Sequence, residues 1–242
     1  TTPEGLPFSL ASMNWIGAVT TNQRIVGIRK GLAPWTPETK AQTGPLWTSL
    51  VSRTTSASYV DSLLLNALTP LRLRVVTGFN GEEADMMFLT GKADVVVSSL
   101  ASLQNFIATG ELVPIMRYSR TGYPPELQSL PTIAQVAGGR AAPEVIELME
   151  RLNDIGRFIL AGPSTPPAIT LALRDAFAQM VKDPEYLAAI TNAGYLNAPT
   201  DGAAVEAMMK DLFGGSGGLR GKLEAALACG KKISDGAQTA CN

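Results

Sequence analysis

The sequence predicts an α/β fold, in which a mostly parallel sheet with helices on both faces is followed by a mainly helical C-terminal part. From residue 46 to residue 118, segments of strand length alternate with segments of helix length, and the connections between them are short. Such alternation is typical of a parallel sheet covered by helices. A stretch rich in glycine and proline, residues 118–131, ends the alternation, and helical patterns dominate the chain beyond it.

The strands are predicted from short apolar runs bounded by turn residues. Two short strands, 14–19 and 24–28, flank a turn at residues 20–22, and further strands are expected at 46–52, 71–76, 93–97, 112–118 and 157–161. Residues 93–97 are apolar except for Asp94, which favours a central position in the sheet. Pro114 lacks a backbone N–H, so it places the strand at 112–118 at an edge or a bulge.

The helices are predicted from helical periodicity and from capping residues. Ser56 or Ser58 is a suitable N-cap for the first helix. Ser164-Thr165-Pro166-Pro167 is a strong start signal for a long helix that ends at Lys182, with an apolar stripe through Ile169, Leu173 and Phe177. Helices are expected at 59–68, 82–89, 100–108, 143–153, 167–182, 184–194, 203–213 and 219–228.

These elements predict five segments along the chain. Residues 1–13 form an irregular N-terminal segment, residues 14–118 an α/β lobe, and residues 119–155 a crossover region. Residues 156–213 form the helical C-terminal part of another, incomplete lobe, and residues 214–242 form a glycine hinge, a last helix and a tail with cysteine.

Composition excludes several classes of function. The 242 residues include 20 basic and 21 acidic side chains and no histidine. This balance argues against nucleic acid as a partner, because such binding needs a dense basic surface. Without histidine there is no Ser-His-Asp or Cys-His pair and no histidine metal ligand. We therefore expect no enzyme, no cofactor and no metal. No apolar run of 18 residues is present, so no membrane-spanning helix is expected.

Two strand-to-helix turns are candidates for ligand binding, because ligands of open α/β sheets bind at the carboxyl ends of strands. The first, residues 53–58, offers four hydroxyl groups at a helix start, which suits a carboxylate or phosphate. Simple N-capping would explain one of these hydroxyls equally well. The second, residues 77–81, has glycines that permit close backbone approach, but Glu82 and Glu83 follow directly and repel an anion. A structural role for this second turn is an equal alternative.

Arginines and cysteines supply the remaining candidates. The arginines that could clamp a carboxylate are Arg53, Arg72, Arg74, Arg117, Arg120 and Arg157, and the alternative is that they are solvated surface residues. Cys229 and Cys241 lie close together near the C-terminus, which favours a local disulfide and an oxidising compartment. Two unrelated free thiols are the alternative.

Several modest motifs, in order, resemble the Bug family of periplasmic solute-binding receptors of tripartite tricarboxylate transporters. Residues 14–19 (NWIGAV) resemble the strand that enters the family's second lobe. Residues 76–81 (VTGFNG) and 91–95 (GKADV) resemble the family's glycine turn and its following acidic motif. The later matching segments are residues 130–133 (LPTI), 156–163 (GRFILAGP), 173–177 (LRDAF), 182–186 (KDPEY) and 192–194 (NAG).

The resemblance implies a type II periplasmic-binding-protein-like fold with two lobes and a non-catalytic role in the periplasm. It implies a small carboxylate as ligand and membrane transporter subunits as partners. Carried onto this chain, the ligand contacts of the second lobe fall on Thr55, Ser56, Ser58, Gly78, Phe79 and Gly81.

Two departures from the family pattern keep a second function open. Only 13 residues precede Asn14, whereas the family has about a hundred there, so the N-terminal part of the first lobe is expected to be lacking. The family's glycine-serine turn is also replaced by residues 54–58 (TTSAS). The alternative is therefore a truncated Bug-like protein that serves as a structural or accessory subunit of a larger periplasmic or membrane-attached complex. Another periplasmic protein would then cover the incomplete lobe.

Overall fold

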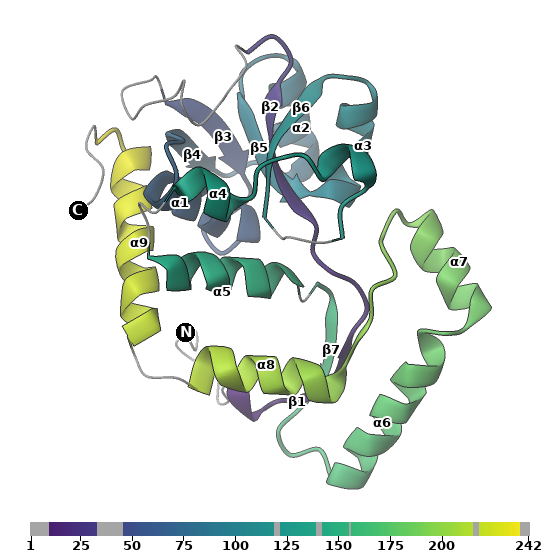
Figure 1. Ribbon diagram of the computed structural model, residues 1–242. Coiled ribbons are helices and arrows are strands. Elements are labelled where there is room, and N and C mark those ends of the chain that lie inside the picture. The colour runs from purple at the N-terminus through teal and green to yellow at the C-terminus, as the bar shows by residue number, and fades with distance from the viewer. Residues whose placement is uncertain are drawn as a thin grey trace. The chain divides into compact units, whose positions relative to one another are not determined.

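The computed structural model describes residues 10–32, 46–118, 122–138, 142–154, 156–214 and 218–237 (Figure 1). The chain divides into two compact units. Unit 1 comprises residues 1–23 and 150–220, and unit 2 comprises residues 24–149 and 221–242. The chain passes from one unit to the other at residues 23–24, 149–150 and 220–221.

This division differs from the predicted segments at three places. Strand β1 (Asn14–Ala18) belongs to unit 1 and not to a lobe over 14–118, because its hydrogen-bonding partners are the strands of unit 1. Most of the expected crossover region belongs to unit 2, where Ile133 and Val145 lie in the core. The last helix also belongs largely to unit 2 and is not part of a separate tail.

Unit 2 is built on a five-stranded sheet in the order β4-β3-β5-β2-β6. Strand β3 is parallel to β4 and β5, whereas β2 is antiparallel to both of its neighbours, β5 and β6. Four strands therefore share one direction, which confirms the mostly parallel sheet. The strands are β2 (Arg24–Arg29), β3 (Trp47–Val51), β4 (Leu73–Thr77), β5 (Val95–Ser99) and β6 (Leu112–Arg117).

Helices cover both faces of this sheet (Figure 1). One face packs on α1, α4, α5 and α9 through Leu65 and Ile133, and the other packs on α2 and α3 through Phe88 and Leu103. The helices are α1 (Ala57–Leu68), α2 (Gly81–Leu89), α3 (Leu100–Ala108), α4 (Ile133–Ala137), α5 (Pro143–Asp154) and α9 (Gly218–Ser234). A short 3-10 helix, η2 (Pro125–Leu127), precedes α4.

The two edge strands of this sheet, β6 and β4, differ in how their outer backbone groups are treated. At β6, Pro114 lies opposite Gly27, next to a register shift, so this strand is both an edge and irregular, as predicted. At β4, side chains from two helices bond to the outer backbone groups. The Asn66 amide bonds to both the N–H and the carbonyl of Leu73, and the Ser234 hydroxyl accepts from the N–H of Val75. These bonds protect an edge that would otherwise be open to pairing.

Unit 1 contains a three-stranded sheet in the order β7-β1-β8, in which β1 is antiparallel to both neighbours. The expectation that segments 14–19 and 24–28 flank a simple turn is therefore incomplete, because β1 and β2 join different sheets. The other elements are η1 (Leu10–Ser12), β7 (Phe158–Ala161), β8 (Thr200–Asp201), α6 (Pro167–Met180), α7 (Pro184–Asn192) and α8 (Gly202–Gly214).

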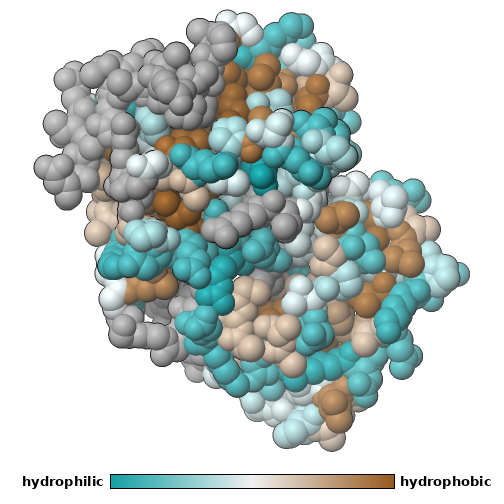
Figure 2. Space-filling view, in the orientation of Figure 1, coloured by the Kyte–Doolittle hydropathy of each residue, from teal (hydrophilic) through white to brown (hydrophobic). Residues whose placement is uncertain are grey.

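Both faces of β1 are covered by helices of unit 1. Trp15 packs with Val205 and Met209 of α8, and Ile16 packs with Phe177 of α6. The expected apolar stripe of α6 is only partly buried, because Ile169 and Leu173 are 51% and 41% exposed. Figure 2 shows apolar patches, in brown, among hydrophilic residues, in teal, on the face in view.

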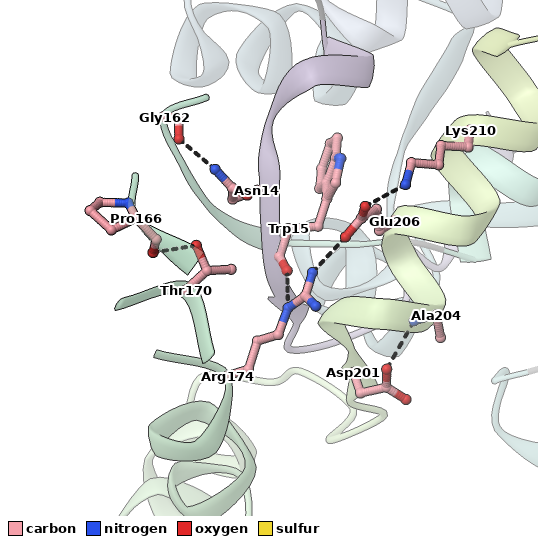
Figure 3. Close-up of polar contacts among 10 residues, drawn as sticks. All are labelled: Asn14, Trp15, Gly162, Pro166, Thr170, Arg174, Asp201, Ala204, Glu206 and Lys210. Atoms are coloured by element: carbon pink, nitrogen blue, oxygen red, sulfur yellow. Dashed lines mark hydrogen bonds and ion pairs between the residues drawn. The ribbon is translucent and has the colours of Figure 1, made fainter. Parts of the chain in front are cut away.

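An arginine ties α6 and α8 to the same strand (Figure 3). Arg174 of α6 donates from Nε to the carbonyl of Trp15 at 2.8 Å, and its Nη2 bonds to Glu206 of α8 at 2.7 Å. Lys210 bonds to the other oxygen of Glu206 at 2.6 Å. These bonds hold the pKa of Glu206 below its ordinary value of 4.5.

Candidate functional site

Parallel strands bring the two predicted turns together at the carboxyl ends of the strands of the unit 2 sheet. Because β3, β4 and β5 run in one direction, the turns that follow them lie at the same edge. The backbone N–H of Gly78 donates to the carbonyl of Ser52 at 3.1 Å, so the turns after β3 and β4 are in contact. We call residues 52–58, 78–81 and 98–99 the strand-end shelf.

Each turn of the strand-end shelf leads into a capped helix. Ser56 accepts from the N–H of Tyr59 at the start of α1, and Asn80 caps α2 in the same way. Ser99 caps α3 by accepting from the N–H of Ser102 at 3.3 Å. The positive ends of three helix dipoles therefore lie at the carboxyl ends of neighbouring strands. Sequence reasoning did not single out the third turn, although Ser98-Ser99 directly after an apolar strand was its signal.

The hydroxyl groups of the first turn have different roles. Ser56 is engaged in the cap on both sides, since its Oγ also donates to the carbonyl of Arg53 at 2.8 Å. Ser58 accepts a hydrogen bond from Arg24 Nη2 at 3.0 Å. Thr55 is exposed at the turn. Of the three predicted contacts in this turn, Thr55 and Ser58 are better placed for a ligand than Ser56, which performs the alternative capping role.

The second turn is shaped by glycine and closed by acidic groups. Gly78 has φ of 107°, a conformation that side chains rarely adopt, and no atom lies near where a Cβ would stand. Phe79 is half-buried and Gly81 begins α2. Glu83 completes a capping box by accepting from the N–H of Asn80 at 3.0 Å. This carboxylate already satisfies the helix start, which makes α2 the least favourable of the three N-termini for an anion.

The predicted arginines that the structure describes lie on different elements. Arg53 lies in the first turn of the strand-end shelf and is exposed, and Arg74 is exposed on β4. Arg117, at the end of β6, donates from Nε to the carbonyl of Leu130 at 3.0 Å. Among the candidates placed by the structure, Arg53 is the one in a predicted ligand turn.

Two other arginines from the predicted set bond to neighbouring groups, each within its own unit. Arg72 precedes β4 and donates to the carbonyl of Ala237 at 3.0 Å. Arg157 in unit 1 stacks over the ring of Tyr195, 3.9 Å from its centroid, and bonds to its hydroxyl. Arg120 lies outside the described residues.

The sequence reasoning missed Arg24, the first residue of β2, which is 7% exposed. Its Nε lies 2.5 Å from Oδ2 of Asp61 on α1, and its Nη2 donates to Ser58 and to the carbonyl of Val97. Burial raises the pKa of Asp61, and the ion pair with Arg24 opposes that rise. Strand alternation with buried Val26 was the signal that could have placed Arg24 on the inner face.

Other expectations concern metals, membranes and the cysteines. Within the ranges that the structure describes, no three histidine, cysteine, aspartate or glutamate side chains gather as a metal site requires. No described helix combines the length and the apolar composition needed to cross a bilayer. Cys229 is buried on α9. Its expected partner Cys241 lies outside the described residues, so the disulfide stays a prediction.

Comparison with solved structures assigns the fold. No protein-family model matches the sequence, and no curated protein matches it. A TctC solute-binding protein from Polaromonas is 17% identical and superposes with a TM-score of 0.63, over 96% of this chain and 72% of that chain. The fold is that of a TctC/Bug solute-binding protein. The predicted type II periplasmic-binding-protein-like architecture is thereby confirmed.

Further structures with this TctC/Bug fold support the assignment. MatC from Rhodopseudomonas palustris, with bound malate, is 15% identical with a TM-score of 0.58, over 96% of this chain and 73% of that chain. Another Rhodopseudomonas palustris protein, solved with adipate, is 15% identical with a TM-score of 0.59, over 96% and 71%. The periplasmic binding protein BugD is 15% identical with a TM-score of 0.53, over 91% and 69%.

Proposed function

We propose that this protein is a non-catalytic, periplasmic solute-binding protein that takes up a small carboxylate for a tripartite tricarboxylate transporter. The observation that supports this most directly is the strand-end shelf, where capped N-termini of three helices meet the sheet edge beside the exposed Arg53. Proteins with the same fold have been solved with malate and with adipate, both of which are dicarboxylates.

Charge distinguishes the three helix N-termini. The first turns of α1 and α3 contain no acidic residue, whereas that of α2 contains Glu82 and Glu83. A carboxylate is therefore attracted to α1 and α3, which follow the adjacent strands β3 and β5. The backbone N–H groups of Ala57 and Ser58, the first residues of α1, point out of the helix toward such an anion.

The predicted contacts acquire definite roles in this proposal. One carboxylate accepts from the N–H groups at the start of α1 and from the hydroxyls of Thr55 and Ser58. The guanidinium of Arg53 neutralises the second carboxylate of a dicarboxylate ligand. The glycine turn after β4, with Gly78, Phe79 and Gly81, forms the neighbouring wall of the strand-end shelf and excludes a second anion through its acidic helix start.

Calorimetry with C4 to C6 dicarboxylates, malate and adipate among them, tests the proposal. We expect one-to-one binding that Arg53→Gln weakens about tenfold, which corresponds to one charge-assisted hydrogen bond. Arg74→Gln is the matched control, because it removes an exposed arginine from the body of β4. Equal affinity of the Arg53 and Arg74 variants would contradict the assigned site. No binding by the wild-type protein would contradict the receptor role and favour an accessory subunit.

A further inference from the structure

Arg24 connects the sheet to the N-terminal turns of α1 at the strand-end shelf. It is opposite Ser99 at the end of β5, so its backbone lies at the same edge as the candidate turns. Its side chain reaches α1 and bonds to Ser58 and to Asp61 one turn later. The same Nη2 atom bonds to the carbonyl of Val97 at 3.1 Å, which anchors the guanidinium on β5.

The backbone of Arg24 is also held in place. The N–H of Tyr118 donates to the Arg24 carbonyl at 3.1 Å, and the hydroxyl of Tyr123 donates to the same oxygen. Tyr118 is fully buried and Tyr123 is 5% exposed. Arg24 therefore has a rigid main chain and a guanidinium anchored by partners on β5 and α1.

The bond from Arg24 determines what the Ser58 hydroxyl can do. A guanidinium has donors only, so Ser58 Oγ must accept from it, and the proton of Ser58 remains available for donation elsewhere. Ser58 is the second residue of α1, and helical side chains lean toward the N-terminal end of their helix. The Ser58 proton is therefore available at the helix end where the proposed carboxylate binds.

Asp61 neutralises the charge of Arg24 inside the protein. Its carboxylate lies 2.5 Å from Arg24 Nε, and both side chains are largely buried, with 8% and 12% of their surfaces exposed for Arg24 and Asp61. The positive charge is thus paired internally and is not presented to solvent. Arg24 consequently does not act as a clamp for the ligand itself.

We propose that Arg24 is a positioning residue, which fixes Ser58 as a hydrogen-bond donor to the carboxylate at the start of α1. The inference rests on the proposed function and assigns a role to a residue that does not touch the ligand. Preorganised donors bind an anion more tightly, because the hydroxyl does not have to be reoriented on binding.

Arg29, at the opposite end of the same strand, supplies a matched control. It also faces an aspartate, since its Nη2 lies 3.6 Å from Oδ1 of Asp94, but its side chain is 28% exposed. Arg29 pairs with Leu112, the first residue of the neighbouring β6. It is therefore separated from the strand-end shelf by the length of β2. Arg29→Lys makes the same chemical change as Arg24→Lys without affecting Ser58.

A double-mutant cycle with malate and adipate tests the inference by calorimetry. We expect Ser58→Ala to weaken binding about tenfold and Arg24→Lys about threefold to tenfold, with Arg29→Lys unchanged. In the Ser58→Ala background, Arg24→Lys should have no further effect on affinity, because its effect passes through the missing hydroxyl. Ser58→Thr, which keeps a hydroxyl, should restore much of the affinity.

The possible results separate this inference from the proposed function. Equal weakening by Arg24→Lys with and without Ser58 would overturn the positioning role, since a general structural effect does not depend on that hydroxyl. Unchanged affinity of Ser58→Ala would overturn it as well, even if the Arg24 variant fails to fold. No binding of any tested carboxylate by the wild-type protein would overturn the proposed function and this inference with it.

Discussion

Asn66 is the residue whose removal we expect to harm unit 2 most directly. Its amide accepts from the N–H of Leu73 at 2.6 Å and donates to the carbonyls of Leu73 and Gly230 at 2.9 and 3.2 Å. It therefore joins α1 both to the edge strand β4 and to α9. Asn66 is 3% exposed, so water does not readily replace these bonds.

Asn66→Ala leaves one buried N–H and two buried carbonyls without this partner. Each buried polar group that loses its partner costs about 1–3 kcal/mol, and carbonyls retain a second lone pair. We therefore expect the free energy of unfolding to fall by about 3–5 kcal/mol, a large share of the roughly 5–15 kcal/mol typical of a domain. Ser234→Ala removes one bond, to the N–H of half-buried Val75, and should cost about 1 kcal/mol.

Urea titration followed by tryptophan fluorescence measures this loss. Of the three tryptophans, Trp47 is buried and lies opposite Leu73 in the β3–β4 pair, so Trp15→Phe and Trp35→Phe in the background isolate its signal. Hydrogen exchange adds a local measurement, in which the Leu73 amide should exchange faster in Asn66→Ala and the Val75 amide faster in Ser234→Ala. A loss under 1 kcal/mol in Asn66→Ala, with the Leu73 amide as protected as in the wild type, would refute the edge-sealing role of Asn66.

Two further predictions concern helix packing and pH. Gly230→Ala places a methyl group 1.9 Å from the carbonyl oxygen of Leu63, so α1 and α9 must separate and unfolding should become easier by about 2 kcal/mol or more. Gly221→Ala on the same helix meets no atom within 4 Å and should be neutral or stabilising by up to about 1 kcal/mol, and urea titration of both variants compares them. The lowered pKa of Glu206 means that its stabilisation is present above the ordinary value of 4.5 and is lost as the pH falls through the folded-state pKa. The difference in thermal unfolding between Glu206→Gln and the wild type should therefore be larger at pH 7 than below pH 4.5 and should shrink as the pH falls, and a constant difference would contradict this.

Local signals in the sequence were sufficient for most helices and strands. The hydroxyl of Ser56 and the apolar periodicity behind it predicted a helix that the structure places at Ala57–Leu68. Pro114 predicted an edge strand for the same local reason, a missing N–H, and the structure confirms it. Caps, prolines and periodicity act within a few residues, so a linear sequence displays them completely.

The sequence predicted less well which distant segments pair or pack together. The sequence shows that residues 14–19 and 24–28 form strands, but it does not show that β1 and β2 join different sheets. It also does not show that the last helix returns to unit 2, where Gly230 permits the close approach of α9 to α1. Both outcomes depend on contacts between segments that are far apart along the chain.

The candidate site shows the same distinction. The sequence alone determined two strand-to-helix turns with hydroxyls and glycines, together with the acidic residues that disfavour an anion at α2. Only the tertiary structure placed these turns side by side, added the third helix start at Ser99, and brought Arg24 to Ser58, 34 residues away. The physical reason is that turns and caps are set by neighbouring residues, whereas the partner of a buried charge is chosen by the packing of the whole unit.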